Sequence, residues 1–374
     1  MKQFDILIVG AGIVGCAVAR ECALAGMHAG VIEGGVPGGG ATAAGMGHVV
    51  VMDDSPAQLA LTGYSRSLWQ RENQTLPAAV EYETRGTVWV AADDEEMLEV
   101  ESKCVAYRGA GIESAILTSR QLAEAEPNLR RGLAGGLLVP GDGVIYPPAA
   151  AGYYLSEAGR MGAELMLSRA VKAAEGVVQL ANGSTIRAEK IVLAVGTECD
   201  LLPALPIEKR KGHLLITDRY PGFLRHQLVE LGYLKSAHQS LEDSVAFNIQ
   251  PRQTGQMLLG SSRQFGSVDP RAESEMMRRM LDRARSYMPG LAQISALRVW
   301  TGFRASTKDK LPLIGPAKGL SDDGSLWLAA GFEGLGITNA PGAARLLVDG
   351  MLGRTPEIAA EPYLPARLIE GLHV

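Results

Sequence analysis

The alternation of apolar and polar residues at the start of the chain predicts a strand, a helix and a second strand in quick succession. Phe4–Val9 is an apolar run broken only by Asp5, which is typical of a buried strand. A helical pattern continues through Ala25, and His28–Glu33 is a second strand-like run that ends in an acid. This order is typical of a parallel sheet covered by helices.

Further along, the pattern predicts helices separated by short strands. The expected helices are Ser55–Leu76, Asp93–Arg108, Pro147–Gly162, Arg271–Met288 and Ile337–Leu352. The expected strands include Gly86–Val90, Val177–Leu180, Thr185–Ala188, Ile191–Val195 and Ser325–Ala330, the second and third forming a hairpin around Asn182-Gly183. The end of the chain therefore repeats the strand, glycine-containing loop and helix of its beginning.

Together these elements predict an α/β protein with two domains. The first is a Rossmann-like domain with a mixed, mainly parallel sheet, built from residues 1–80, 145–215 and 305–374. The second is an antiparallel, β-rich substrate-binding domain that also carries helices, built from residues 81–144 and 216–304. The first domain is thus discontinuous in sequence.

Composition narrows the class of protein. Glycine makes up 45 of 374 residues, against a usual share of about 7%, which indicates backbone that approaches something closely. A net charge of −5 and 5% aromatic residues argue against a nucleic-acid-binding protein. The four cysteines are scattered without CxxC spacing, so no metal site is expected. With no signal peptide or transmembrane segment expected, we predict a cytoplasmic protein, and peripheral association with the inner face of the membrane stays open.

The turn after the first strand carries a dinucleotide-binding fingerprint. Gly10, Gly12 and Gly15 form a GxGxxG motif between the strand and the helix, and Glu33 follows Gly15 by 18 residues. In this motif the first glycine allows the tight turn, the second admits a pyrophosphate to the backbone, and the third permits close helix–strand packing. We expect Glu33 to accept hydrogen bonds from an adenosine ribose.

Two further glycine-containing segments favour a flavin over a nicotinamide cofactor. Residues 34–47 are almost all small, and Thr42 among them is expected near phosphate. The second segment, Gly331–Gly336, joins a strand to a helix whose positive end would stabilise negative charge on a reduced isoalloxazine ring. A surface loop and an unliganded helix cap are the alternatives for these two segments.

Arg304 is the candidate for holding a substrate. It lies in the apolar sequence Trp300-Thr301-Gly302-Phe303-Arg304, where a solvated charge is not expected. Its planar guanidinium can hold a carboxylate through two hydrogen bonds. From the pattern alone, an ion pair with Asp309 or Glu333 is an equally good explanation.

Four ordered motifs resemble the FAD-dependent D-amino-acid oxidase and glycine oxidase family. They are VGAGIVGCAVA, ATAAGMG, GFRASTKDKLPLIG and GFEGLGITNAPGAA, and the likeness covers essentially the whole chain. Within this family the sequence is most similar to the flavoprotein subunits of D-hydroxyproline dehydrogenase and hydrogen cyanide synthase. The stretch from Asn248 to Arg263 carries that finer resemblance.

The resemblance implies a set of cofactor-binding residues and one substrate-binding residue. Matching FAD contacts, in addition to Gly10, Gly12 and Gly15, are Ile13, Val14, Glu33, Gly34, Ala41, Thr42, Gly45, Met46, Gly47, Val171, Gly196, Gly334, Leu335, Gly336, Ile337 and Thr338. Among them Val171 matches a backbone contact to adenine. Arg304 matches the arginine that binds the substrate carboxylate, and His48 is a candidate on the substrate side of the flavin.

The sequence departs from its relatives at two points. Phe332 replaces a histidine that many relatives carry in the last motif, and no cysteine lies near Arg304 to attach a flavin, so non-covalent FAD is expected. Tyr146, Tyr233 and Trp300 are weaker candidates for the substrate pocket, and each is equally explained as a core residue.

The resemblance implies oxidation of a small amino acid at its carbon–nitrogen bond, with the α-carbon hydride passing to flavin N5. We expect a dehydrogenase for cis-4-hydroxy-D-proline that forms a cyclic imine. Glycine, sarcosine or another D-amino acid is the alternative substrate, and a redox subunit of a multi-chain amine dehydrogenase is the alternative role. The expected electron acceptor is oxygen, a quinone or a partner redox subunit, in a homo- or hetero-oligomer.

Overall fold

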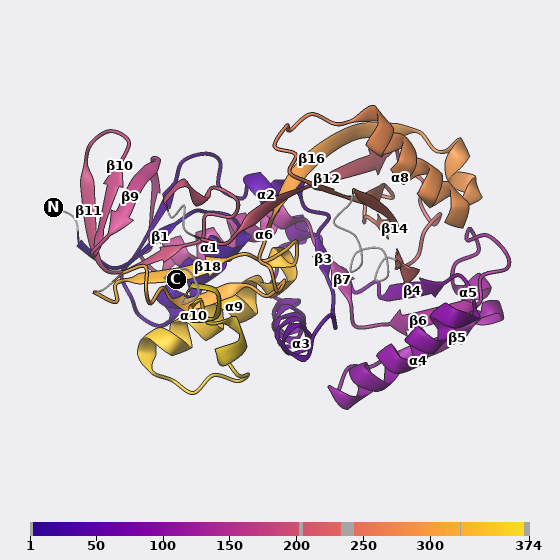
Figure 1. The fold of residues 1–374 in the computed structure, drawn as a ribbon, viewed down its shortest axis with the longest axis horizontal. Coiled ribbons are helices and arrows are strands. Elements are labelled where there is room, and N and C mark those ends of the chain that lie inside the picture. The colour runs from indigo at the N-terminus through magenta and orange to yellow at the C-terminus, as the bar shows by residue number, and fades with distance from the viewer. Residues whose placement is uncertain (1–2, 202–204, 233–242, 322, 370–374) are drawn as a thin grey trace.

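The computed structural model describes residues 3–201, 205–232, 243–321 and 323–369. Two large sheets lie side by side along the long axis of the molecule, each covered by its own helices (Figure 1). We call the sheet that contains β1 the first sheet and the sheet that contains β12 the second sheet. This two-sheet α/β architecture confirms the fold class predicted from the sequence.

The first sheet has the order β17-β18-β11-β1-β2-β8, and β10 and β9 extend it from β11. Its strands are β1 (Gln3–Val9), β2 (Ala29–Glu33), β8 (Glu164–Leu167), β9 (Ala170–Ala174), β10 (Val177–Leu180), β11 (Thr185–Leu193), β17 (Leu313–Pro316) and β18 (Leu326–Ala330). The central strands β18, β11, β1, β2 and β8 are parallel. Their carboxyl ends therefore meet at one edge of the sheet.

The second sheet has the order β16-β12-β15-β14-β13-β4-β6-β5 and is antiparallel except between β13 and β4. Its strands are β4 (Thr87–Ala91), β5 (Ala115–Thr118), β6 (Gly135–Val139), β12 (Glu208–Thr217), β13 (Gln227–Glu230), β14 (Ser244–Pro251), β15 (Met257–Phe265) and β16 (Ala296–Ser306). A short ribbon pairs β3 (His48–Val49) with β7 (Gly143–Val144).

Helices cover both sheets. The α-helices are α1 (Ile13–Leu24), α2 (Gly40–Ala44), α3 (Pro56–Glu72), α4 (Asp94–Gly109), α5 (Ser119–Ala125), α6 (Pro147–Arg160), α8 (Ser274–Tyr287), α9 (Gly336–Leu352) and α10 (Ala366–Ile369). Short 3₁₀ turns occur at η1 (Ala78–Val80), η2 (Cys199–Leu201), η3 (Pro289–Gln293) and η4 (Glu361–Tyr363). Helix α1 contacts both α6 and α9 against the first sheet, and α8 covers β14 and β15 of the second.

Helix α1 packs tightly because it is buried nearly all round and consists mostly of small and branched apolar residues. Cys16, Ala17, Val18 and Ala19 are all buried in the core that α1 shares with α6 and α9. Small side chains let the helices approach one another closely, and this fixes the amino end of α1 against the carboxyl end of β1.

Most elements lie within a few residues of their predicted bounds, and two of the differences have a clear cause. Helix α3 ends at Glu72 and not at Leu76, because the N–H and hydroxyl of Thr75 both donate to the Glu72 carbonyl and turn the chain. Strand β11 runs unbroken where two strands were predicted, because residues around Lys190 pair with β1 and keep the chain extended. Neither difference moves the ends of β1 and β18.

Two strands of the second sheet cross the predicted domain boundaries. Strand β12 crosses the predicted boundary at residue 215, yet it pairs along its length with β16 of the second sheet. Strand β16 crosses the predicted boundary at residue 304. We propose that the second domain includes all of both strands and begins just before β12.

Candidate functional site

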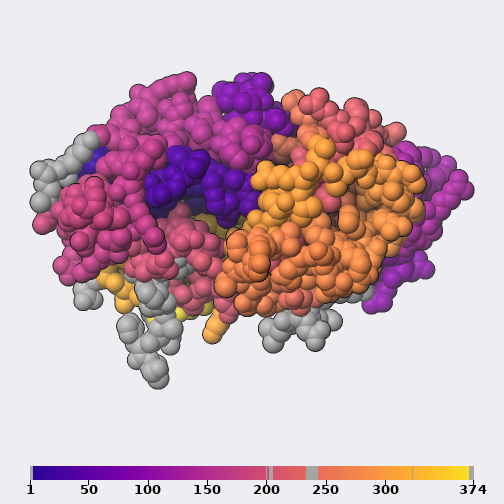
Figure 2. Space-filling view, turned by 90° about the horizontal axis from the view of Figure 1, so that it is seen from above, coloured from indigo at the N-terminus to yellow at the C-terminus, as the bar shows by residue number. Residues whose placement is uncertain are grey.

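A cavity of about 700 Å³ lies at the carboxyl ends of the parallel strands of the first sheet and extends to the second sheet. Val9, Glu33, Ala194 and Ala330 line it where β1, β2, β11 and β18 end or have just ended. Figure 2 shows the surface hollowed where the indigo amino-terminal segment lies between magenta and pink segments on one side and orange segments on the other. This edge is where open α/β sheets bind ligands.

In the turn between β1 and α1, main-chain atoms that no side chain covers face the cavity. Gly10 has a φ of +104°, and a Cβ there would lie 2.5 Å from the Ala194 carbonyl oxygen. A Cβ at Gly15 would overlap the Gly10 carbonyl oxygen, so Gly15 allows the helix to pack on the turn and does not itself line the cavity. Gly12 caps α1 without a side-chain hydrogen bond and lines the cavity. The helix therefore presents its positive end to a ligand.

Glu33 and Thr42 hold this turn in place. The Ala11 N–H donates to Glu33 Oε2 at 2.7 Å, and the Gly35 N–H donates to Glu33 Oε1 at 2.6 Å. The Thr42 hydroxyl accepts a hydrogen bond from the Ile13 N–H at 3.0 Å. Both Glu33 and Thr42 line the cavity. The carboxylate therefore lies at the end of β2, where the sequence places a ribose-binding acid.

The small-residue segment continues along the cavity from α2 to β3. The lining residues here are Gly39, Gly40, Ala41, Thr42, Ala44, Gly45, Met46, Gly47 and His48. A Cβ on Gly45 would lie 2.6 Å from Ile337 Cδ1, so the segment and the start of α9 are in direct contact. Because these residues have small side chains or none, a ligand in the cavity can approach their main chain closely.

The loop before α9 forms the opposite wall. Gly331, Phe332, Glu333, Gly334, Leu335, Gly336 and Ile337 all line the cavity, and the amino end of α9 opens toward it. Thr338 does not line it. Its hydroxyl instead donates to the His48 carbonyl at 2.9 Å and accepts from the Val50 N–H at 3.2 Å. Thr338 therefore fixes β3, and through it His48, against α9.

Arg304 lies on β16 at the second-sheet end of the cavity. Its side chain crosses β12 above Gly212, where a Cβ would lie 2.6 Å from Arg304 Nη1, and Nη1 donates to the Ser262 carbonyl on β15 at 3.0 Å. A Cβ on Gly334 would lie 3.2 Å from Arg304 Cδ. Two glycines, one from each sheet's side of the cavity, thus leave the space that Arg304 occupies.

The acids considered as structural partners of Arg304 have other cations beside them. Asp309 accepts from Arg367 Nε at 2.6 Å. Glu333 lies 3.4 Å from Arg210 Nη1 and 3.9 Å from Arg263 Nη2. Arg304 itself lines the cavity.

His48 lines the cavity in its neutral form. Burial lowers the pKa of His48 to about 4, because removal from solvent disfavours the charged imidazolium. Its ring Nε2 is buried and has no hydrogen-bond partner among the described residues. An unpartnered buried nitrogen is costly, so a ligand that bonds to it would gain stability.

The remaining sequence candidates differ in whether they line the cavity. Val171 is 48% exposed on β9, although its neighbours Arg169 and Ala170 do line the cavity. Tyr146 is 46% exposed, and Trp300 Nε1 donates to the Ala44 carbonyl at 3.2 Å. Tyr233 lies outside the described residues. Gly196 lines the cavity after β11.

The structure also places residues at the site that the motifs did not indicate. Gly212, Asn248, Ser261 and Arg263 of the second sheet line the cavity. The signal for Gly212 was a single glycine inside a strand pattern, which often marks a close approach by another group. The others carry no local signal, because their position depends on the pairing of distant strands.

These residues fit an FAD. The residues that line the cavity extend from the amino end of α1 to Arg304, and many of them are glycines. A Cβ on Gly12 would lie 3.3 Å from the Thr42 hydroxyl, so only glycine leaves room for a pyrophosphate between them.

Within the described part of the chain no three His, Cys, Asp or Glu side chains are placed to hold a metal ion. No described helix is long and apolar enough to cross a membrane.

Replacing Gly212 with alanine should weaken substrate binding. The added methyl group would meet Arg304 Nη1 and push the guanidinium out of line, so we expect KM to rise about tenfold, equivalent to about 1.4 kcal/mol, with little change in kcat. Steady-state kinetics measure this. Gly152→Ala on the exposed face of α6, where a Cβ meets nothing within 4 Å, is the matched control. An unchanged KM in the Gly212 variant would exclude this packing role.

Comparisons with known proteins agree with this geometry. A family profile described as DAO, FAD dependent oxidoreductase, matches residues 5–350. The glycine oxidase of Pseudomonas aeruginosa is 28% identical over 390 residues, which span 96% of this chain and 98% of the relative.

Two solved structures share the fold. The L-proline dehydrogenase from P. horikoshii superposes with a TM-score of 0.88 at 23% identity, covering 99% of each chain. The glycine oxidase from Geobacillus kaustophilus superposes with a TM-score of 0.86 at 24% identity, covering 98% of this chain and 99% of the other. At these identities the two likenesses establish the fold alone.

Proposed function

Because the chain belongs to the DAO family of FAD-dependent oxidoreductases, we propose that it oxidises the carbon–nitrogen bond of a small cyclic D-amino acid, cis-4-hydroxy-D-proline. The coarser activity, FAD-dependent oxidation of an amino acid or amine, follows from the family and from the glycine oxidase relatives. The finer assignment rests on the resemblance of residues 248–263 and on the polar groups at the substrate end of the cavity.

One observation carries the proposal: Arg304 lies at the far end of a cavity whose other end fits a pyrophosphate. A guanidinium placed there can bind the carboxylate of an amino acid through two charge-assisted hydrogen bonds. The carboxylate then fixes the position of the neighbouring α-carbon, which lowers the entropic cost of reaching the reactive geometry.

The residues of the chain act by binding and orientation. When bound, FAD supplies the acceptor for the hydride that leaves the α-carbon as the amine becomes an imine. Arg304 orients the substrate, and Phe332, Leu214 and Met46 form apolar walls that keep water away. The amino end of α9 faces the same cavity and favours negative charge beside it.

His48 has a role that follows from its neutral state. With a pKa of about 4 it carries no charge near neutral pH, so it does not repel a substrate ammonium or compete with Arg304 for the carboxylate. We propose that its ring contacts the substrate side of the cavity. The family resemblance implies no obligatory side-chain base at the α-carbon, so we propose that the substrate amine is neutral when the hydride leaves.

Asn248 favours a hydroxylated substrate. It lines the cavity, and its side-chain Oδ1 is buried without a hydrogen-bond partner in the described structure. A hydroxyl donor on the ligand would remove the cost of this unpaired acceptor. Glycine, sarcosine and D-proline carry N–H donors at the amine but no hydroxyl group.

Replacing Asn248 with leucine should reduce the preference for the hydroxylated substrate. The two side chains have similar size, but leucine accepts no hydrogen bond, so the ratio of kcat/KM for cis-4-hydroxy-D-proline over D-proline should fall about tenfold. The reaction of D-proline in the same variant is the internal control. A ratio that stays unchanged would remove Asn248 from substrate recognition and leave the hydroxyl specificity without support.

The class of electron acceptor is tested separately. The purified chain is supplied with its substrate, and oxygen consumption is compared with reduction of a quinone or an artificial dye. An oxidase consumes oxygen at the full rate of turnover, whereas a dehydrogenase turns over only with the other acceptors.

The identity of the substrate is tested with the same assay. Full turnover on glycine or sarcosine but not on cyclic D-amino acids would favour the alternative substrate.

A further inference from the structure

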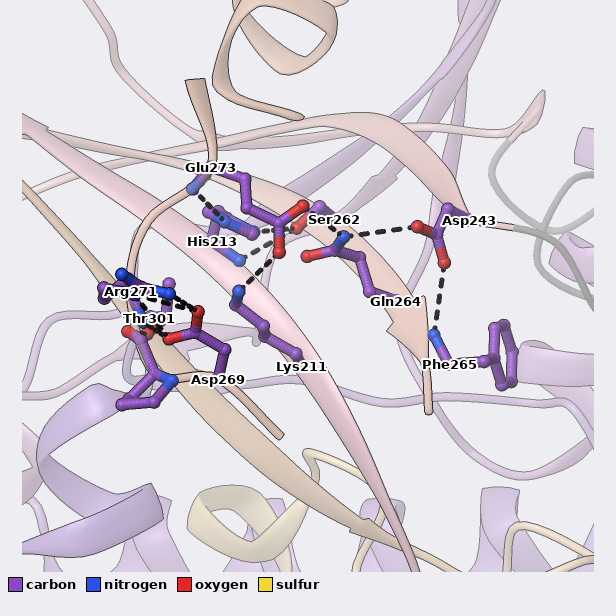
Figure 3. Close-up of polar contacts among 11 residues, drawn as sticks. Lys211, His213, Asp243, Ser262, Gln264, Phe265, Asp269, Arg271, Glu273 and Thr301 are labelled. Carbon is purple, nitrogen blue, oxygen red and sulfur yellow. Dashed lines mark hydrogen bonds and ion pairs between the residues drawn. The ribbon is translucent and has the colours of Figure 1, made fainter. Parts of the chain in front are cut away.

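A polar network joins side chains of the second sheet to the segment before α8 (Figure 3). Along β12 the side chains alternate: Gly212 and Leu214 line the cavity, while Lys211 and His213 point to the other face. Lys211 and His213 are fully buried. A buried cation and a buried imidazole side by side need defined partners.

The hydrogen bonds of His213 define its tautomer. The backbone N–H of Glu273 donates to His213 Nε2 at 3.1 Å, so Nε2 carries no proton. Nδ1 of the neutral ring is then the protonated nitrogen, and it donates to the Ser262 hydroxyl at 2.9 Å. The backbone N–H of His213 donates to the same hydroxyl at 2.9 Å. Ser262 is thus fixed by two donors from one residue.

Ser262 joins this network to Arg304. The ladder between β12 and β15 is interrupted between Lys211 and Leu215, so the Ser262 carbonyl is available to accept from Arg304 Nη1 at 3.0 Å. The hydroxyl of Ser262 replaces the missing ladder acceptor for the His213 N–H. One buried residue, 1% exposed, therefore faces His213 with its hydroxyl and Arg304 with its carbonyl.

Glu273 anchors the outer end of the network. Its carboxylate accepts from Lys211 Nζ at 2.7 Å and from Gln264 Nε2 at 2.9 Å. These bonds hold the residue that precedes α8, so that its backbone N–H points at His213. The segment before α8 is thereby tied to β12 and β15.

We propose that Ser262 and His213 are positioning residues for Arg304, and that protonation of His213 loosens the carboxylate site so that substrate affinity falls in acid. This proposal rests on the proposed function, because it assumes that Arg304 binds the substrate carboxylate. Protonated Nε2 would present a hydrogen to the Glu273 N–H, which breaks the bond that fixes the ring. The ring and Ser262 would then shift together, and the Ser262 carbonyl would no longer hold Arg304 in place.

The groups around His213 set the direction of its titration. Burial lowers the pKa of His213, Lys211 on the same strand lowers it further, and Glu273 opposes both. The remaining neighbours are the Asp269–Arg271 ion pair in the loop before α8 and the uncharged Ser262 and Thr301 of the adjacent strands. Because the pKa in the folded chain lies below its ordinary value, the neutral ring persists at neutral pH. Affinity should therefore be full at neutral pH and fall as the pH drops through the lowered pKa.

The experiment measures the Kd of acetate, a carboxylate without an amine, for the FAD-bound protein by the change in flavin absorbance, between about pH 5.5 and 8.5. The variants are Ser262→Ala, His213→Asn and, as control, Thr301→Val. Thr301 belongs to the same network, through a bond to the Pro270 carbonyl, but does not contact Ser262. Steady-state KM and kcat for the amino acid are measured in parallel.

We expect Ser262→Ala to raise the Kd of acetate and the KM of the substrate about five- to tenfold, with kcat nearly unchanged. His213→Asn should abolish the acid-side rise in Kd, because asparagine does not titrate. Thr301→Val should behave like the wild type. A wild-type Kd in the Ser262 variant, or an acid-side rise that persists in His213→Asn, would overturn the positioning role. If the wild type itself binds no carboxylate beside the flavin, the proposed function fails instead.

Discussion

Replacing Arg304 with alanine raises KM for the amino-acid substrate about 100-fold while FAD stays bound. Each charge-assisted hydrogen bond to a carboxylate is worth about 1.5–3 kcal/mol, and 1.4 kcal/mol corresponds to a tenfold change in affinity. Arg304 lies at the opposite end of the cavity from the α1 turn, so its loss leaves the pyrophosphate-binding backbone intact. Steady-state kinetics and the flavin absorbance of the purified variant measure the two effects separately.

Arg298→Ala is the matched control, because Arg298 lies on the same strand, β16, but is exposed and stacks on Trp300. Its KM should equal that of the wild type. Arg304→Lys should recover only part of the loss, because an ammonium lacks the planar pair of donors. An Arg304→Ala variant with unchanged KM would remove the carboxylate-binding role and with it the mechanism proposed above.

Replacing Gly12 with valine should abolish FAD binding without unfolding the chain. Gly12 has an extended backbone, with φ of −68°, that any residue can adopt, so the substitution adds side chain and no backbone strain. Its Cβ would lie 3.3 Å from the Thr42 hydroxyl, and the valine methyl groups would fill the space in front of α1. We expect a protein purified without yellow colour and an affinity for FAD reduced at least 100-fold.

The check is titration of the purified variant with FAD, together with its circular dichroism. Gly159→Ala on α6, where a Cβ meets nothing within 4 Å, should bind FAD normally and be slightly more stable. A folded Gly12→Val protein that retains FAD at the wild-type level would show that the cofactor does not lie against this turn.

The cofactor end of the site was largely predictable from the sequence, because its chemistry is local. Gly10, Gly12 and Glu33 follow two strands at fixed spacing, and the strand ends carry them to the same edge of the sheet. Thr338 shows what local chemistry does not report. Its hydroxyl binds the His48 carbonyl and the Val50 N–H, contacts that join residues 288 or more positions apart.

The substrate end was not predictable in detail, because it is built across strands. Arg304, Gly212 and Ser262 come from β16, β12 and β15, and their juxtaposition depends on the register of two antiparallel pairings. No local pattern reports a register between distant strands. The interruption of the β12–β15 ladder that frees the Ser262 carbonyl is likewise a property of the folded sheet alone.

In the proposed reaction, bound FAD is reduced by an amino acid whose carboxylate is held by Arg304. The most direct measurement mixes the FAD-bound protein anaerobically with cis-4-hydroxy-D-proline or with its methyl ester, and follows the visible absorbance of the flavin. The free amino acid should bleach the flavin at low concentration, and the ester should need about 100-fold more because it lacks the charge. A flavin that is bleached equally by both compounds, or by no amino acid at all, would contradict the account.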